Sequence, residues 1–474
     1  MAVAAPPVRE AQTASVDGVF ETPAEVDALI TDVEGQVPAG LVGALYRVGP
    51  GKLDLADHLF DGDGMVSAVH FGPAGEIRFR NRFVRTDKYL AELHATRPKV
   101  AGFGTRAAGG VLGNALRRPT TKNNAANTAL LPLNGRLLAL WEAGHPWQLD
   151  PDSLETIGEM DFNGALEARL PFSAHPHRDP ATGEVFNFGM VYGPRNSVAT
   201  YRIDAQGRLH HVAETRVPAP VLNHDFIITD RWLVFCLGPA RVHLLPLLSG
   251  LASFGDSIHF HRDQATTVVL VPRDGGSATY IDAEPWFQYH FAGAFDDGDD
   301  IVVDLVRYPD YESINAPLKD FRHITAYQPE ERLWRYRISP TRRSVEGHEV
   351  APLSIEFPQV DPRRATGGYR VVYGACGSQG GALSGIARID VSTGETDLHD
   401  FGDGHLASEP LFVPRPHSDA EDDGWLLALV YNPGRRAGDA VVLDARAPSA
   451  GPLCTAHLPV NTAVTFHGAW RDAR

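Results

Sequence analysis

Residues 226–235 read FIITDRWLVF and residues 266–272 read TTVVLVP, and runs of this kind decide the fold. They are rich in Val, Ile, Leu and Phe, which favour strands over helices. Similar runs recur almost from end to end of the chain, as in MVSAVHF (65–71), EVFNFGMVYG (184–193), IVVDLVRY (301–308) and DAVVLDA (439–445). Turn dipeptides such as DG, NG and GG separate them. The pattern predicts an all-β fold, either a propeller or a large sandwich.

Length and composition suit one large globular unit, because closed β architectures can hold 474 residues in a single domain. We expect a flexible segment over residues 1–20 and a single domain over residues 21–474. The first twenty residues lack the basic and apolar regions of a signal peptide, and no run approaches the 18 apolar residues of a membrane span. The cysteines Cys236, Cys376 and Cys454 are too few and too scattered for a disulfide framework. A reducing cytoplasm is therefore the expected location.

The formal net charge of −16 argues against nucleic acid as a partner, because an acidic surface repels phosphate. It leaves apolar contact with a membrane open. Residues 242–254, VHLLPLLSGLASF, are the most apolar short run, and Pro246 and Gly250 interrupt it. The run could be a packed cap segment, or an exposed patch at a tunnel mouth that docks peripherally on a membrane. The oligomeric state cannot be inferred from the sequence.

Four of the twenty histidines stand in strand-like or aromatic surroundings: His175 in SAHPHRDP, His224 in NHDF, His290 in WFQYHF and His467 in TFHGAW. A single histidine is more often a surface or core residue than a ligand, and the spacing of these four matches no helical metal motif. A propeller could nevertheless bring them to its axis, because the innermost strand of each blade lines the central channel. Spacing alone leaves both interpretations open.

Ordered blocks around these histidines resemble the carotenoid cleavage oxygenase family from about residue 33 to the end. Among them are VEGQVPAGLVGALYRVGPG (33–51), HLFDGDGMVSAVHF (58–71), ALWEAG (139–144), IEFPQVD (355–361) and SEPLFVPRP (408–416). The first block departs from the family at Val48, where Asn is usual. The resemblance implies a seven-bladed β-propeller, capped by a dome of helices and loops over an iron site on its axis. It also implies one Fe(II) per chain, held by His175, His224, His290 and His467, with O2 as co-substrate.

The resemblance assigns further residues to the surroundings of the iron. Glu142, Glu356 and Glu409 match the family's glutamates that accept the second N–H of a ligating imidazole. Thr128, in ANT, matches a threonine whose methyl group crowds a coordination position. Asp61 and Asp63, in FDGDGM, are expected to cap a turn, because the acidic pattern of an EF-hand is absent.

The implied reaction is oxidative cleavage of one C=C bond into two carbonyl products. Residues 244–273 resemble the apocarotenoid-cleaving branch, which favours an apocarotenoid, such as an apocarotenal cleaved to retinal. Relatives that cleave stilbenoids commonly have Lys before the first glutamate, whereas this chain has Trp141, which suits a polyene better than a phenolate. A stilbenoid or phenylpropanoid dioxygenase, and a propeller that binds or isomerises a lipid without oxygenation, are the alternatives. Candidate tunnel residues, each of which could equally be ordinary core, are Phe60, Trp141, Phe226, Phe287 and Phe291.

Overall fold

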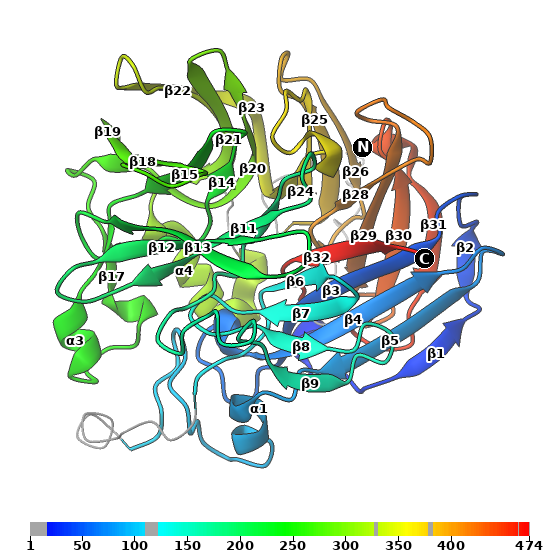
Figure 1. Cartoon of the computed structure of the whole chain (residues 1–474). Helices are drawn as coiled ribbons and strands as arrows, with labels where there is room; N and C mark the ends of the chain where they lie inside the picture. Colours follow the sequence, from blue (N-terminus) through cyan, green and yellow to red (C-terminus); the bar gives the residue numbers. More distant parts are fainter. Residues whose placement is uncertain (1–16, 110–121, 327–329, 378–382, 463, 474) are drawn as a thin grey trace, which may run out of the picture.

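The computed structural model describes residues 17–109, 122–326, 330–377, 383–462 and 464–473. Within these ranges the strands form the seven antiparallel blades of a β-propeller (Figure 1). The first blade is β1 (Asp27–Ile30), β5 (Ile77–Phe83), β4 (Asp63–Phe71), β3 (Gly43–Lys52) and β32 (Gly468–Asp472). The second is β6 (Ala129–Leu133), β7 (Arg136–Leu140), β8 (Trp147–Leu149) and β9 (Thr156–Glu159). The third is β10 (His177–Arg178), β11 (Val185–Val191), β12 (Ser197–Ile203) and β13 (Leu209–Arg216).

The remaining blades include one strand that serves two of them. The fourth blade is β14 (Ile227–Ile228), β15 (Trp232–Leu237), β18 (Thr266–Pro272) and β19 (Thr279–Ala283). The fifth is β20 (Phe287–Asp297), β21 (Asp300–Tyr308), β22 (Arg332–Ser339) and the first part of β23 (Ser344–Gln359). The end of β23 begins the sixth blade, with β24 (Val371–Cys376), β25 (Gly385–Asp390) and β26 (Thr396–Asp400). The seventh is β27 (Leu406–Ala407), β28 (Leu411–Pro414), β29 (Gly424–Asn432), β30 (Ala437–Asp444), β31 (Pro452–His457) and β2 (Val33–Gly35).

Strands from the two ends of the chain complete neighbouring blades. β32 pairs with β3, and β2 pairs with β31, so each of these two blades contains both early and late segments. Each strand alternates side chains between its two faces, and the buried residues of adjoining blades meet in seven hydrophobic clusters, one per blade interface. Trp425 of β29 and Phe79 of β5, for example, meet between the seventh and first blades. The ring is thus closed by apolar burial as well as by hydrogen bonds.

A dome of short helices and loops covers one end of the propeller. Its helices are η1 (Asp17–Phe20), η2 (Leu59–Asp61), α1 (Asp87–Glu92), α3 (Leu244–Leu248), η3 (Gly255–Ser257), α4 (Tyr311–Lys319) and η4 (Phe321–Ala326). The two-stranded ribbon of β16 (Ala240–Val242) and β17 (Ile258–Phe260) belongs to it, and α3 lies at its lower left edge in Figure 1. Two further short helices, η5 (Pro362–Arg364) and η6 (Pro448–Ala450), belong to connections between strands.

Two expectations from the sequence bear on the ends of the chain and on membranes. The expected flexible segment 1–20 lies outside the described residues up to residue 16, and its last four residues form η1, in which Val19 is buried. No helix among the described residues is long and apolar enough to cross a membrane. The three cysteines are free thiols and are buried.

Candidate metal centre and its cavity

The four singled-out histidines lie at the inner edge strands of four blades. His175 and His224 precede β10 and β14, His290 lies within β20, and His467 immediately precedes β32. Each of these strands ends the strand order of its sheet. Residues far apart in sequence therefore meet at the axis, because every blade presents its innermost strand there.

The four imidazoles point one nitrogen each at a common centre. Nε2 of His224 lies 2.8 Å from Nε2 of His175 and 3.3 Å from Nε2 of His290, and Nε2 of His467 lies 3.1 Å from that of His290. All four ligand atoms lie within 4.8 Å of one another. A metal ion about 2.1 Å from each nitrogen separates neighbouring ligands by about 3 Å. The donor set and its spacing therefore fit one divalent transition ion.

Burial keeps part of this cluster in the form that binds metal. Burial lowers the pKa of His175 well below its usual value, and the neighbouring His224, His467 and His290 lower it further. The pKa of His467 is also lowered, because burial outweighs the opposing effect of Glu409. A neutral imidazole offers its lone pair to a metal, whereas an imidazolium cannot.

The three predicted glutamates lie directly behind three of the four rings. Oε2 of Glu356 is 2.6 Å from Nδ1 of His290, and Oε1 of Glu409 is 2.8 Å from Nδ1 of His467. Oε1 of Glu142 contacts Nδ1 of His224. A carboxylate in this position fixes which nitrogen keeps its proton, and so directs the other nitrogen to the centre.

Glu409 is part of a buried charge network that the sequence did not reveal. Nη1 of Arg47 donates to Oε2 of Glu409 at 2.7 Å, and their side chains are 0% and 2% exposed. Nε2 of Gln359 donates to Oε1 at 2.8 Å, and the amide of Gly468 donates to Oε2 at 2.9 Å. Burial raises the pKa of Glu409, but His467 and Arg47 more than offset it and bring the pKa to about 2. The carboxylate is therefore held as an anion.

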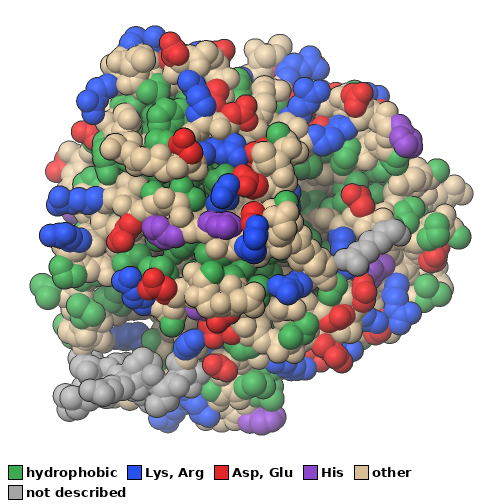
Figure 2. All heavy atoms as spheres, viewed as in Figure 1, with side chains coloured by type: hydrophobic (Ala, Val, Ile, Leu, Met, Phe, Trp, Pro, Cys, Tyr) green, Lys and Arg blue, Asp and Glu red, His purple; other side chains and the backbone are tan. Residues whose placement is uncertain are grey.

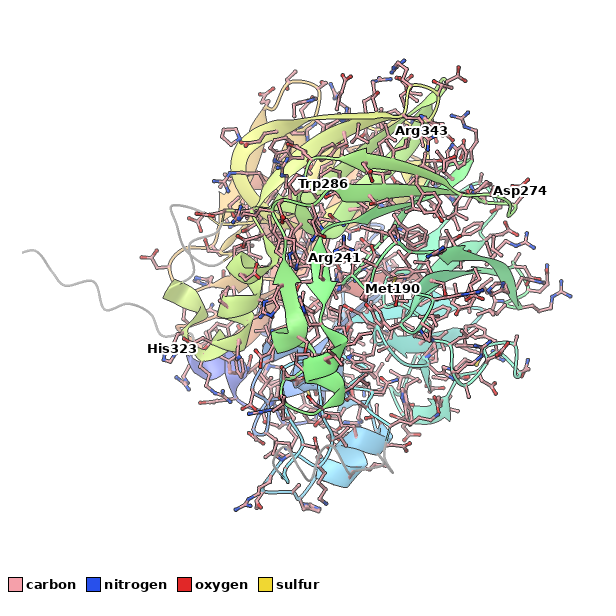
Figure 3. The ribbon with its side chains drawn as sticks, turned by 90° about the vertical axis from the view of Figure 1, so that its left-hand side faces the viewer. Met190, Arg241, Asp274, Trp286, His323 and Arg343 are labelled. Carbon is pink, nitrogen blue, oxygen red and sulfur yellow. The ribbon has the colours of Figure 1, made fainter. Side chains whose placement is uncertain are left out.

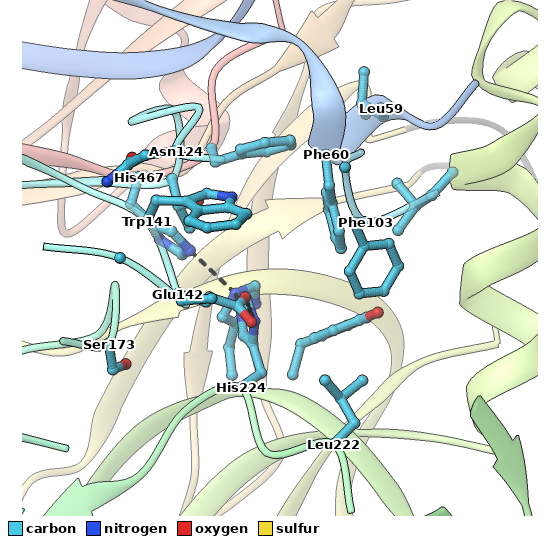
Figure 4. Close-up of a pocket in the computed structure, with 18 of the residues that line it drawn as sticks. Leu59, Phe60, Phe103, Asn124, Trp141, Glu142, Ser173, Leu222, His224 and His467 are labelled. Atoms are coloured by element: carbon cyan, nitrogen blue, oxygen red, sulfur yellow. Dashed lines mark hydrogen bonds and ion pairs between the residues drawn. The ribbon is translucent and has the colours of Figure 1, made fainter. Parts of the chain in front are cut away.

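The other two glutamates are supported differently. The hydroxyl of Tyr308 donates to Oε1 of Glu356 at 2.5 Å, and the amide of Phe357 donates to Oε2. The Glu142 side chain is 28% exposed and lines the cavity above the histidines, where Figure 4 places it beside His224. One glutamate is thus tied into the protein core by a cation, one by a tyrosine, and the third faces open space.

Among the described residues, no glutamate lies behind the fourth ring, that of His175. The nearest carboxylate oxygen is Oδ1 of Asp225, 3.8 Å from its Nδ1. Asp225 is buried, and its carboxylate is hydrogen-bonded to Nε2 of His177 at 3.0 Å. It also accepts hydrogen bonds from the amides of Phe226 and Phe291 at 2.8 and 3.1 Å. It anchors the inner strands of the fourth and fifth blades to each other. Its position directly after His224 in NHDF was the only signal for it in the sequence.

A cavity of about 860 Å³ opens above the histidines. Phe60 and Trp141 line it, as predicted, and they face each other across it in Figure 4. Thr128 also lines it, and its hydroxyl donates to Oδ1 of Asn127 at 3.0 Å. A mainly apolar wall with few polar groups suits a long hydrophobic ligand.

The prediction that Phe226, Phe287 and Phe291 line the tunnel is wrong. All three are buried in hydrophobic clusters away from the lining of this cavity. Phe226 packs against Phe235 between the third and fourth blades, and Phe287 packs in the dome. Phe291 follows His290 at an irregular point in the pairing of β20 with β21, and its side chain packs between the fourth and fifth blades.

Several aromatic lining residues were missed because no sequence pattern places them. Phe103, Phe254, Tyr289, Phe357 and Phe466 all line the cavity. Tyr289 stands edge-on to the His224 ring with centroids 4.8 Å apart. Its buried hydroxyl has no hydrogen-bond partner among the described residues, which leaves it available to a ligand.

The expected turn-capping role of Asp61 and Asp63 is wrong, because both carboxylates contact residues far from their own turn. The carboxylate of Asp61 accepts the amides of Phe103, Gly104 and Thr105, and it thereby fixes the loop that carries Phe103 beside Phe60. Asp63 instead accepts from Nζ of Lys88 on α1 at 2.8 Å. The FDGDGM block therefore holds the dome to the propeller and contributes no metal ligand.

Comparison with known proteins identifies the family that has this architecture. The family model described as "Retinal pigment epithelial membrane protein" matches residues 19–472. The chain belongs to the RPE65/carotenoid oxygenase family. This confirms the resemblance noted in the ordered sequence blocks.

Among carotenoid oxygenase relatives, the chain is 36% identical over 469 residues to the apocarotenoid-15,15'-oxygenase of Synechocystis, covering 96% of this chain and 95% of that protein. It is 31% identical to resveratrol cleavage oxygenase 1 of Aspergillus fumigatus, with coverage of 96% and 95%. The crystal structure of cobalt-substituted Synechocystis ACO superposes with a TM-score of 0.90 at 35% identity, covering 97% of this chain and 98% of that one. The expected seven-bladed propeller of the family is thereby confirmed.

Proposed function

We propose that this chain is a non-heme Fe(II) dioxygenase that cleaves one C=C bond of an apocarotenoid with O2. One alkene and one O2 give two carbonyl products, so no further oxidant or reductant is needed. The observation that supports this most strongly is the convergence of four buried histidine nitrogens beneath a largely apolar cavity. The name of the Synechocystis relative, an apocarotenoid-15,15'-oxygenase, points the same way.

In this proposal His175, His224, His290 and His467 hold the iron. Fe(II) held there would supply electrons to O2. Glu142, Glu356 and Glu409 keep the proton of each partner imidazole on Nδ1, so that Nε2 faces the metal. The methyl group of Thr128 narrows the space beside the iron and restricts what can approach it.

The cavity walls bind and orient the substrate. Phe60, Phe103 and Trp141 offer aromatic faces to a conjugated chain, and the dome excludes water from the reacting bond. Trp141 stands directly before Glu142 and therefore lies close to the metal centre (Figure 4). An indole ring packs against a polyene but offers no cation to a phenolate, which favours an apocarotenoid over a hydroxystilbene.

A substrate panel with iron-loaded protein tests this proposal. Apocarotenals of several lengths, β-carotene and a hydroxystilbene are each incubated with the enzyme in air and without oxygen, and products are identified by mass. We expect an apocarotenal to be cleaved with consumption of one O2 per turnover, and the His290→Ala protein, treated identically, to be inactive. Preferential cleavage of the hydroxystilbene would replace the substrate assignment. Isomerised product formed without oxygen would overturn the dioxygenase assignment itself.

We further propose a cytoplasmic enzyme that touches membranes peripherally through residues 242–254. Leu245, Leu248 and Leu251 are 82%, 76% and 61% exposed, and Figure 2 shows hydrophobic side chains at the lower left, where Figure 1 places α3. Leu247, in contrast, packs into the dome cluster. An exposed apolar group of this kind beside a lipid-binding cavity fits contact with acyl chains.

Vesicle co-sedimentation tests the membrane proposal. Leu245→Asp with Leu248→Asp removes exposed apolar surface without touching the core, so it should abolish binding to phosphatidylcholine vesicles while soluble-substrate cleavage continues. Leu29→Asp changes a leucine on β1 that is 60% exposed; it is the matched control and should still bind. Absence of vesicle binding by the unmodified protein would remove the proposal.

A further inference from the structure

A second group of histidines lies on the surface, outside the cavity. His243 directly follows β16, His259 lies on β17, and His261 directly follows β17. His243 and His259 are exposed, and His261 is half-buried. The His243 ring is 5.1 Å from the His259 ring and 5.9 Å from the His261 ring, measured between centroids. None of these three side chains has a hydrogen-bond or ion-pair partner among the described residues.

The β16–β17 ribbon sets all three side chains on one face. Ala240 pairs with Phe260 and Val242 with Ile258, and these residues turn inward to the dome cluster. Alternation therefore turns His243, His259 and His261 outward. The amide of His261 donates to the carbonyl of Pro239 at 3.1 Å, so the hydrogen bonding between the two strands continues to His261. The side chain of His261 therefore faces the same side of the ribbon as that of His259.

We propose that His243, His259 and His261 form a second metal site that takes a borderline divalent ion such as Zn²⁺. Two histidines at positions i and i+2 of a strand present both imidazoles to one side, and the cross-strand His243 supplies a third ligand. Imidazole is a preferred ligand of Zn²⁺, and three nitrogens leave a tetrahedral position for water.

The ring separations can be judged against the metal centre of the same molecule. There, the ring centroids of neighbouring histidines lie 4.3 to 5.3 Å apart. The His243–His259 pair falls inside that range, and the His243–His261 pair lies slightly outside it. Among the described residues, only the axial group has all its ligand atoms within 4.8 Å. The surface rings must therefore turn towards one another, which solvent-facing side chains can do, and binding should be weaker than at the axis.

Neighbouring charges set the strength of the site. Arg241 shares the outward face, opposite His259, and its Nε donates to Oε1 of Gln264 at 2.8 Å. Figure 3 shows the ribbon from this side with Arg241 labelled on it. Arg262 is paired with Asp310, and Asp263 is exposed. The nearby cation opposes a metal ion, whereas the chain's net charge of −16 favours one overall.

The position of His243 gives such an ion a mechanical effect. His243 is the residue immediately before α3, and its side chain makes no cap hydrogen bond to that helix. An ion shared with His259 would tie the start of α3 to β17. The short helix would then be held against the ribbon.

Zinc binding to iron-loaded, full-length protein tests the site. We expect calorimetry to show one Zn²⁺ bound per chain with no loss of iron, and His243→Ala or His259→Ala to weaken that binding at least tenfold. His348→Ala, which removes an exposed histidine from the outer part of β23, is the matched control and should bind as the unmodified protein does. Absence of Zn²⁺ binding at constant iron content, or equal binding by all four proteins, would overturn the proposal.

Hydrogen exchange locates the ion independently. Zn²⁺ should slow amide exchange over residues 243–249 in the unmodified protein but not in His259→Ala. Slowing in both proteins, or slowing confined to other segments, would contradict the assignment. Neither result depends on cleavage activity, so failure of this site would leave the proposed dioxygenase function untouched.

Discussion

The two sides of the axial histidine cluster are supported in different ways. Behind His467, the carboxylate of Glu409 is paired with Arg47, and both side chains are almost completely buried. Behind His224, the side chain of Glu142 is 28% exposed and lines the cavity. The first side is enclosed by the inner strands of the propeller, and the second opens towards the dome.

This difference indicates which side sets the metal position and which side adapts to the substrate. A buried ion pair is rigid, because moving either partner leaves a charge without solvation. A carboxylate at a cavity wall can exchange neighbours as a ligand enters. We therefore expect damage at the buried side to affect folding and metal together, and damage at the open side to affect metal or substrate alone.

Removing a ligand from the centre of the cluster should have the largest effect. Nε2 of His290 lies 3.3 and 3.1 Å from those of His224 and His467, so His290→Ala breaks the cluster in the middle. Loss of a partner behind a ligand costs about 10–100-fold in metal affinity, and loss of the ligand itself should exceed about 100-fold. Iron content by elemental analysis measures this. The control His211→Ala changes an exposed histidine on β13 and should retain its iron. Retention of iron by His290→Ala as well would refute the four-histidine site.

Breaking the buried pair should come next. Arg47→Met leaves Glu409 as a buried, uncompensated anion, and we expect the free energy of unfolding to fall by about 3–5 kcal/mol. The double variant Arg47→Met, Glu409→Gln removes both charges and should recover part of that loss. Urea unfolding of the unmodified protein, the single variant and the double variant measures these free energies of unfolding. A loss of less than about 1 kcal/mol for Arg47→Met, typical of an exposed pair, would contradict the contrast between the two sides.

The strands were predictable because a half-buried strand leaves a local signal. TTVVLVP became β18 and IVVDLVRY became β21, each with alternating or continuous burial. The number of blades was not predictable from such runs. β23 serves two blades, and the first and seventh blades each combine segments from both ends of the chain. Only the family resemblance implied the number seven.

The residues of the metal centre and its cavity were also only partly predictable from the sequence. The structure brings together the four histidines and three glutamates that the resemblance implied, but nothing in the sequence joins Arg47 to Glu409, 362 positions away. The tunnel failed for a related reason. Phe291 and Tyr289 both flank His290, yet of these two only Tyr289 lines the cavity, so proximity to a ligand in the sequence does not decide which side chain reaches the cavity.

A change at the open side should weaken metal binding while leaving the fold intact. Glu142→Gln keeps the shape but exchanges the anion behind His224 for a neutral amide, and we expect iron to dissociate about tenfold more readily. Glu142, unlike Glu409, is not paired with a buried arginine, so the substitution leaves no uncompensated charge in the core. The free energy of unfolding of the metal-free protein should therefore change by less than about 1 kcal/mol. Chelator-driven iron release and urea unfolding measure the two quantities. Strong destabilisation would show that the open side is as tightly built as the buried side.

The smallest expected effect concerns substrate alone and separates cavity walls from core. Trp141→Ala removes an aromatic face worth about 1 kcal/mol from the cavity, so KM for an apocarotenal should rise several-fold while iron content is unchanged. Phe226→Leu is the matched control, since Phe226 was predicted to line the tunnel but packs between the third and fourth blades. It should lower stability and leave KM alone. If Phe226→Leu raised KM as much as Trp141→Ala, the substrate-binding cavity would extend beyond the residues that line it in the structure. If neither did, the substrate would have to lie towards Phe60 and Phe103, away from the open side.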